Sequence, residues 1–599
     1  MSNGNSMNLK LSIALGLALA VSGSAGAVDL ERVAPKKPAG KTEAGSLGVS
    51  APPLAEGKGD ASSAQGPALK GIVIVKSRDE VRKSGDLDVS GLKIGAGDKL
   101  DLLRGPDFSF LLETFIGERV TEANIRNIQR EIIIYYRSQG RSVVDVVVPE
   151  QTSIGAGVLQ IFVMEGSLGK VEVEGNRWTS EELIAKNLHL EEGAAINTGQ
   201  LLEDINWLNR NPGRQISPSL RPGASVGSSD VVLQVEESRP FRVFAGVENT
   251  GPRFTGSERF FVGGNWFNAF GADHRMSYQF TSDVEFQFLK AHSASYEIPL
   301  PWRHTVSIYG GYSDAESDFP GALAPTQEAT SWQASIRYNI PLPKIRSYHH
   351  SLSLGFDFKT FNNDIIFLGI PGTGGTTDVD IAQFAAQYQG SMPDQYGATS
   401  GGISGYYSPG DLLGSNNDDV SFAAARVASE ADYMYTRASM ERQTKLPFQM
   451  SWVIRAQGQY AGGNLQSSEQ LGLGGYATVR GYDEREGNGD IGYIVSNEIH
   501  SPTFSPASLI SENATDRLYF LGFYDYGEVR PVSIPSVTAG QDPVITMDSV
   551  GLGFRYAVGR NFSLRFDYGW QLRDSGVLTG LFGQRKNSSR GHVGATVSF

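Results

Sequence analysis

The second half of the chain alternates between apolar and polar residues. A clear example has an apolar face made of Phe562, Leu564, Phe566, Tyr568 and Trp570. Strict alternation with period two indicates β-strands that bury or cover one face. Runs of this kind follow one another from Arg242 to Phe599. They number about sixteen, an even count that is typical of bacterial membrane barrels.

A β-sandwich would alternate in the same way. However, about 360 residues of strands without helical periodicity would make a very long sandwich, and aromatic strand ends are typical of membrane interfaces. The charged residues on the second face need water or partners, which the interior of a wide barrel provides. We therefore predict a transmembrane antiparallel β-barrel of about sixteen strands over residues 239–599.

Before Pro240 the pattern is mixed, and helical spacing alternates with short apolar runs. Residues 68–166 are predicted to form one α/β module, with a helix from Thr121 to Gln139 and strands at 71–75, 142–148 and 158–164. Residues 167–238 are predicted to form a second, in which Thr179 to Glu182 would be a capping box that opens a helix. Both modules have the order strand, helix, strand, strand, so we interpret them as an internal repeat. Residues 77–107 fit neither pattern clearly.

The first residues predict export. Lys10 precedes the apolar run Leu11–Val21, and the small residues up to Ala27 complete a signal-peptide pattern over residues 1–27. A short buried helix is the alternative interpretation of this run. Residues 28–67 are rich in Ala, Pro, Gly, Lys and Ser, which is typical of a flexible linker.

The amino-acid composition excludes several classes of functional site. The 599 residues include no cysteine and carry a net charge of −13. The absence of cysteine excludes thiolate metal sites, thiol catalysis and disulfides, and the acidic balance argues against a nucleic-acid partner. We find no catalytic set, no metal site and no cofactor motif. His349 and His350 are interpreted as a polar strand end, and Gly372–Thr376 lacks the lysine of a phosphate loop and is interpreted as an extracellular loop. We therefore do not expect an enzyme.

One segment of the barrel region differs from the rest. Eight glycines fall between Gly458 and Gly487, in a long loop at about residues 461–490 that contains Val479, Arg480, Gly481 and Tyr482. Gly481 permits a sharp turn after Arg480, whose planar guanidinium stays charged in a confined polar space. We predict that this loop folds into the barrel. The alternative is an exposed hairpin tip with a solvated arginine.

From the first module to its end, the chain resembles the two-partner-secretion outer-membrane transporters (TpsB type, the hemolysin secretion/activation proteins). These belong to the superfamily that includes the barrel-assembly insertases. The motifs that carry the resemblance occur in the family's order: Tyr135-Tyr-Arg-Ser-Gln-Gly140, Val148-Pro-Glu-Gln151 and Glu165-Gly166, then Leu208-Asn-Arg-Asn-Pro212 and Leu220-Arg-Pro-Gly223, then Gly246-Val-Glu-Asn-Thr-Gly251, Val479-Arg-Gly-Tyr482, Phe523-Tyr-Asp525 and Gly594-Ala-Thr-Val-Ser-Phe599.

The resemblance implies that the two modules are periplasmic POTRA domains that recognise a secreted exoprotein (TpsA type) as an unfolded substrate. It further implies that Arg480 pairs with Asp525 of the Phe523–Asp525 motif on the barrel wall. Gly594, Val597 and Phe599 would belong to a C-terminal signal read by the barrel-assembly machinery. The expected location is the bacterial outer membrane, in contact with its lipid.

Three alternatives to this function are open. The protein could be an assembly factor that inserts other barrel proteins, although two modules rather than a longer array favour the transporter. It could be an outer-membrane enzyme, although no nucleophile, base and orienting group converge in the sequence. The modules could also only brace the barrel. Family members usually have an N-terminal helix that plugs the barrel, and the proline-rich residues 28–67 do not predict one.

Overall fold

A computed structural model describes residues 66–599 except 83–86, 96–97, 142, 319–325, 367–375, 512–514, 534–543 and 578–587. The predicted signal peptide and most of the predicted linker therefore lie outside the described residues. The described part divides into two compact units, one containing the α/β region up to Pro240 and the other containing the strands from Phe241 to the C-terminus. No helix among the described residues is long and apolar enough to cross a membrane.

The first α/β region is built on a sheet with the order β2-β1-β4-β3. Its strands are β1 (Gly71–Val75), β2 (Gly91–Ile94), β3 (Val144–Val147) and β4 (Val158–Glu165), and its helices are α2 (Pro106–Glu113) and α3 (Glu122–Ser138). Thr121 caps α3 by accepting a hydrogen bond from the N–H of Asn124, as the sequence predicted. Ile128, Ile132 and Tyr136 are the buried residues of α3, and they pack on the sheet in one apolar core.

The predicted strand order of this region is incomplete. Residues 77–107, which the sequence pattern did not place, contribute the strand β2 and the start of α2. Strand β2 pairs in parallel with β1, so the sheet has four strands among the described residues rather than the three expected. Only four residues form β2, which is too short to produce a recognisable alternation.

The second α/β region is built on a sheet with the order β5-β7-β6. Its strands are β5 (Ser167–Glu174), β6 (Arg214–Pro222) and β7 (Ser228–Glu237), and its helices are α4 (Glu181–Lys186) and α5 (Thr198–Asn209). Leu201, Ile205 and Leu208 of α5 are buried against the sheet in one apolar core. The boundaries 68–166 and 167–238 assigned to the two regions stay predictions.

The cap of α4 is displaced by one residue from the predicted capping box. Ser180 is the N-cap and accepts from the N–H of Leu183. Thr179 instead donates its N–H to Glu237, and its hydroxyl accepts from Arg214. Burial would raise the pKa of Glu237, but its hydrogen bonds to Thr179, Trp178 and Arg177 hold that pKa below its usual range.

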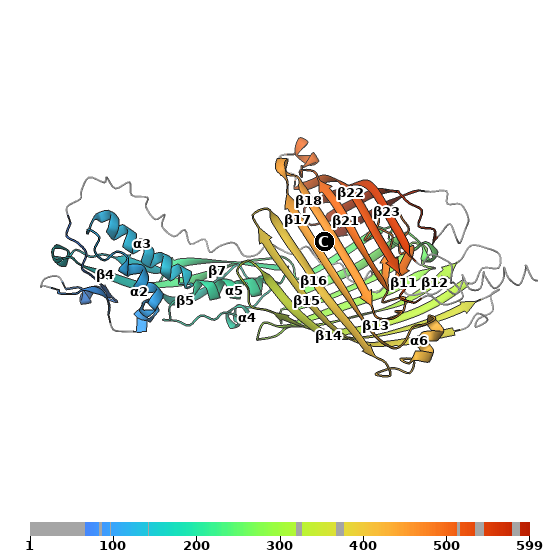
Figure 1. The fold of residues 1–599 in the computed structure, drawn as a ribbon, viewed down its shortest axis with the longest axis horizontal. Coiled ribbons are helices and arrows are strands. Elements are labelled where there is room, and N and C mark those ends of the chain that lie inside the picture. The colour runs from blue at the N-terminus through green and yellow to red at the C-terminus, as the bar shows by residue number, and fades with distance from the viewer. Residues whose placement is uncertain are drawn as a thin grey trace, which may run out of the picture. The chain divides into compact units, whose positions relative to one another are not determined.

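The second unit is a closed antiparallel barrel (Figure 1). Among the described residues sixteen strands close it, as the sequence predicted. They are β8 (Phe241–Glu248), β9 (Arg259–Ala269), β10 (His274–Asp283), β11 (Leu289–Pro299), β12 (Thr305–Asp318), β13 (Thr326–Pro341), β14 (His349–Ile366), β15 (Thr376–Asp394), β16 (Gly397–Pro409), β17 (Asp432–Lys445), β18 (Ser451–Ala461), β21 (Ile491–His500), β22 (Asp516–Arg530), β23 (Ile545–Val558), β24 (Phe562–Gln571) and β25 (Ser589–Ser598).

The alternation read from the sequence separates the two faces of the barrel wall. On β23 and β24, Val550, Leu552 and Trp570 are exposed, whereas Ser549 and Asp567 are fully buried. Apolar residues therefore face outward, where lipid would contact them, and polar residues face the lumen. His349 begins β14, which agrees with its interpretation as a strand end.

The two ends of the barrel differ in the length of their connections. At one end short turns such as 270–273 and 559–561 join neighbouring strands, whereas at the other end residues 410–431 and 462–490 form long connections. Short turns are typical of the periplasmic end and long loops of the extracellular end. Helix α6 (Asp419–Ala425) belongs to the 410–431 connection and lies beside the strand ends in Figure 1, where its Phe422 packs against Ile381 and Tyr433 of the wall.

The barrel closes where its last strand meets its first. Strand β25 pairs with β8 from Gly594 opposite Glu248 to Ser598 opposite Phe244, with Val597 opposite Ala245. Phe599 continues this pairing, because its N–H donates to the carbonyl of Val243. The C-terminal motif therefore lies on the closing strand, and its recognition by an assembly machinery stays a prediction.

Candidate functional site

Residues 462–490, the lumenal loop, connect β18 to β21 and fold against the inner face of the barrel wall. The loop contains a small hairpin of β19 (Leu471–Leu473) and β20 (Gly487–Gly489). Four of its apolar side chains pack with Ile494, Val529 and Met547 of the wall in one buried cluster, and they are Leu471, Leu473, Val479 and Tyr482. Burial of such side chains stabilises the packed loop by roughly 1.5–3 kcal/mol for each one that is completely covered.

Arg480 lies near the tip of the loop and is 3% exposed. Its Nε and Nη2 donate to the two carboxylate oxygens of Asp525 over 2.7 Å and 2.8 Å. The backbone N–H of Arg480 also donates to Asp525, and the guanidinium carbon lies 3.5 Å from the centroid of the Phe523 ring. A bidentate pair of this kind is directional as well as strong, so it fixes the orientation of the arginine.

Two further carboxylates contact the same guanidinium. Nη1 of Arg480 lies 2.8 Å from Glu498 on β21 and 3.4 Å from Asp567 on β24. Arg455 contacts Glu498 and Arg555 contacts Asp567, over 3.0 Å and 2.9 Å. Arg480, Asp525, Glu498 and Asp567 are called the Arg480 cluster. Positive and negative groups alternate within and around it, which offsets the cost of removing these charges from water.

Glu498 and Asp567 were not identified from the sequence. Asp567 alternates with the outward residues Phe566 and Tyr568, so its lumenal orientation was predictable. Its contact with Arg480 was not, because 87 residues separate the two in the chain. Glu498 has no motif around it that would distinguish it from other polar wall residues.

Gly481 lies in direct backbone contact with the wall. Its φ is +93°, and a Cβ at this position would lie 2.9 Å from the carbonyl oxygen of Gly569. Its N–H donates to Nε2 of His592 on the closing strand β25. The hydroxyl of Tyr482 donates to the carbonyl oxygens of Asp548 and Arg573 over 3.0 Å and 2.6 Å. All four residues from Val479 to Tyr482 therefore contact the wall.

Gly481→Ala should loosen the loop tip. A left-handed backbone costs an L-residue about 1–2 kcal/mol, and the new methyl group would also displace Gly569. We expect trypsin to cut the lumenal loop after Arg485 about tenfold faster in the purified variant, since 1.4 kcal/mol corresponds to a factor of ten. Gly463→Ala is the matched control, because a Cβ at Gly463 meets no atom within 4 Å. Equal cleavage rates in both variants would contradict this role of Gly481.

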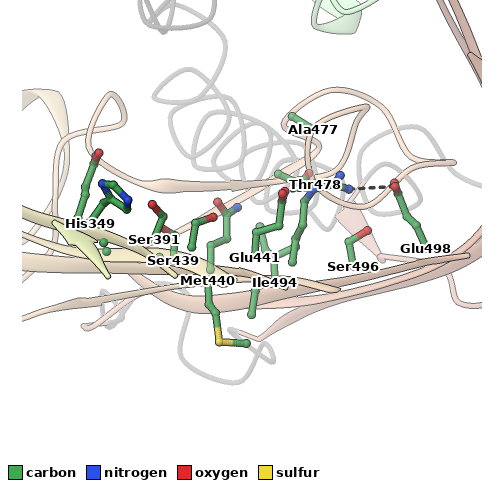
Figure 2. Close-up of a pocket in the computed structure, with 18 of the residues that line it drawn as sticks. His349, Ser391, Ser439, Met440, Glu441, Ala477, Thr478, Ile494, Ser496 and Glu498 are labelled. Carbon is green, nitrogen blue, oxygen red and sulfur yellow. Dashed lines mark hydrogen bonds and ion pairs between the residues drawn. The ribbon is translucent and has the colours of Figure 1, made fainter. Parts of the chain in front are cut away.

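A cavity of about 950 Å³ lies between the loop tip and the inner wall, toward the periplasmic end. Figure 2 shows Ala477 and Thr478 of the loop across from Ser391 and Ser439 of the wall, whereas the side chain of Met440 points away from the loop. Arg480 and Glu498 also border it. In the described part of the chain, no group of three or more His, Asp and Glu side chains is arranged to hold a metal ion. The cavity is lined by polar, charged and apolar side chains, among them Glu441, Arg455 and Leu521.

A family model described as "Haemolysin secretion/activation protein ShlB/FhaC/HecB" matches residues 227–552. This match covers more than half of the chain. It begins near the end of the second α/β region and includes the lumenal loop, Glu498 and Asp525.

Among individual proteins, the heme/hemopexin transporter protein HuxB of Haemophilus influenzae is 21% identical over 459 residues, which are 72% of this chain and 77% of the relative. The outer membrane transporter CdiB-2 of Burkholderia pseudomallei is 22% identical over 468 residues, or 76% of this chain and 74% of the relative. The solved structure of CdiB from Escherichia coli superposes with a TM-score of 0.69 at 16% identity, covering 91% of this chain and 94% of that one. The last likeness establishes the shared fold.

Proposed function

Since this chain belongs to the haemolysin secretion/activation protein family, we propose that it is an outer-membrane transporter that exports an unfolded partner protein. We further propose that the partner is a secreted exoprotein of the TpsA type. Relatives named as outer-membrane and heme/hemopexin transporters support the transport class.

The observation that carries the proposal is the lumenal loop. A barrel that only occupied the membrane would have no need of a buried charged loop, since burying charges costs several kcal/mol for each ion before pairing. Here the loop lies in the lumen, where its contacts with the wall hold it in place. It borders a cavity large enough for several residues of an extended chain. We infer that the barrel lumen is the export path and that the position of the loop controls it.

The two α/β regions are proposed to receive the partner before it enters the barrel. Each sheet has edge strands, and an extended chain can pair with such an edge through its main chain. Main-chain pairing tolerates many sequences, which suits an unfolded substrate. Insertion of the transporter itself through the barrel-assembly machinery, and its contact with outer-membrane lipid, belong to this proposal.

Comparing a host strain with and without this chain tests the function. We expect one large protein to disappear from the culture medium and the cell surface, and its unfolded form to accumulate or be degraded in the periplasm. Quantitative proteomics of the three fractions detects this change whichever protein the partner is. Depletion of many unrelated barrel proteins from the outer membrane would instead indicate an assembly factor and would overturn the proposal.

A further inference from the structure

Glu469 attaches the lumenal loop to a second part of the barrel wall. It lies on the limb between β18 and β19 and is 1% exposed. Its carboxylate accepts hydrogen bonds from the ammonium of Lys359 over 2.8 Å, from the hydroxyl of Tyr435 over 2.6 Å and from the amide of Gln383 over 3.1 Å. These four residues are called the Glu469 cluster. No local pattern in the chain indicates it, because Lys359 and Glu469 are 110 residues apart.

The backbone around Glu469 is held by the same wall. The carbonyl oxygen of Glu469 accepts from Arg437 of β17 over 3.0 Å and from Gln459 of β18 over 3.1 Å. Lys359 lies on β14 and Gln383 on β15. The limb is therefore attached to the wall from β14 to β18, whereas the Arg480 cluster lies on β21, β22 and β24.

The two clusters hold the loop across the lumen. In the closed barrel β14 and β24 are separated by seven strands in either direction, so Lys359 and Asp567 lie on opposite sides. Only eleven residues separate Glu469 from Arg480 in the loop. At one side a loop carboxylate meets a wall ammonium, and at the other a loop guanidinium meets wall carboxylates. The loop thus closes the lumen as a bridge with opposite charges at its two attachments.

The two attachments differ in what must be broken to release them. Arg480 has a bidentate pair, a ring contact and two further carboxylates. The side chain of Glu469 has one ion pair and two neutral hydrogen bonds with the wall, and a third neutral hydrogen bond from Ser468 stays within the loop. A lysine ammonium is also a point charge on a flexible chain, without the fixed fork of an arginine. Compared by their side chains, the Glu469 attachment is therefore the one that releases with less loss of interaction.

The cavity described above forms the periplasmic part of the path that such a release would open. On β14, β15 and β17 the cavity is lined at positions 349–351, 389–391 and 439–441. Lys359, Gln383 and Tyr435 lie on the same three strands, displaced toward the extracellular end. The Glu469 limb consequently covers the outward continuation of the cavity.

We propose that the contact between Glu469 and Lys359 is the releasable closure of the export path, and that the limb leaves this wall during export while Arg480 stays attached. This inference rests on the proposed function. Glu469 and Lys359 act in it as positioning residues. They hold the loop across the lumen and make no contact with the exported chain in the closed state.

Conductance of the purified transporter in planar lipid bilayers tests the closure without any partner protein. Glu469→Gln and Lys359→Met each remove the ion pair, and we expect each to raise the fraction of time spent in open levels about tenfold, as a lost 1.4 kcal/mol would. The charge exchange Glu469→Lys with Lys359→Glu should return the channel toward the closed level. Arg442→Gln is the matched control, since Arg442 pairs with Asp394 on the wall. Unchanged conductance in both single variants would overturn the inference.

Cross-linking tests whether the release is needed for export. Because the chain contains no cysteine, Lys359→Cys with Glu469→Cys places the only two thiols at the closure. A short bismaleimide that joins them should stop export in cells that exported before the treatment. Continued export through the linked transporter would overturn the inference. If no partner is exported even by the unsubstituted chain, the proposed function fails, while the conductance measurement still decides whether Glu469 closes the lumen.

Discussion

Arg480→Ala should reduce export of the partner by at least tenfold while the amount of barrel in the outer membrane stays the same. The variant leaves Asp525 buried without its bidentate partner, and removing one member of a buried ion pair costs about 3–5 kcal/mol. Asp525 is fully buried, so water cannot replace the lost donors unless the loop moves. The tip of the lumenal loop should therefore leave the wall. Without this attachment the loop no longer has a fixed closed or open position.

The experiment measures exported partner and heat-modifiable barrel in the same cells. Arg485→Ala is the matched control, because Arg485 lies in the same loop and donates to Asn488, Ser467 and Gln470 of that loop. Arg480→Lys keeps the charge but cannot form the bidentate pair, so it should export at an intermediate level. Normal export by Arg480→Ala at normal insertion would reject a role for this residue in transport.

The order of elements was predictable wherever the signal is local. Alternation over ten residues, as in Phe562–Gln571, predicts a strand and its two faces. Thr121 predicts the start of α3 because the capping hydroxyl and the N–H that donates to it are three residues apart. Summed over 16 strands, this local signal was enough to predict a membrane barrel. The short strand β2 was missed because four residues do not show a period.

The site was only partly predictable, and the reason is distance along the chain. Arg480 and Asp525 were connected through the resemblance to a family, not through their spacing. Glu498, Asp567, Glu469 and Lys359 lie on alternating strands or in the loop, where any lumenal position would be polar. Which of these positions meet one another depends on the barrel closure and on the course of the loop, neither of which leaves a periodic pattern.

Deleting residues 170–237 should abolish binding of the unfolded partner to the transporter. The deletion removes nearly all of the β5-β7-β6 sheet and no residue of a barrel strand, since β8 starts at Phe241. The two edges of this sheet differ. Strand β6 contains Pro218 and Pro222, which cannot donate to an added strand, and Asn209 occupies the N–H and carbonyl of Ile216. We therefore expect the partner to pair with β5.

Single prolines in β5 separate this pairing from a merely bracing role of the sheet. Successive N–H groups of a strand point to opposite edges, so one of Glu172→Pro and Val173→Pro removes an outward donor and the other removes a donor to β7. The variant that loses the outward donor should bind a partner fragment at least tenfold more weakly, a loss of about 1.4 kcal/mol, while amide exchange shows that its sheet stays folded. The variant that loses a donor to β7 should bind more weakly and should also show faster amide exchange in the sheet. Full binding by the folded variant, or by the 170–237 deletion, would mean that the sheet braces the barrel and that the partner is recognised elsewhere.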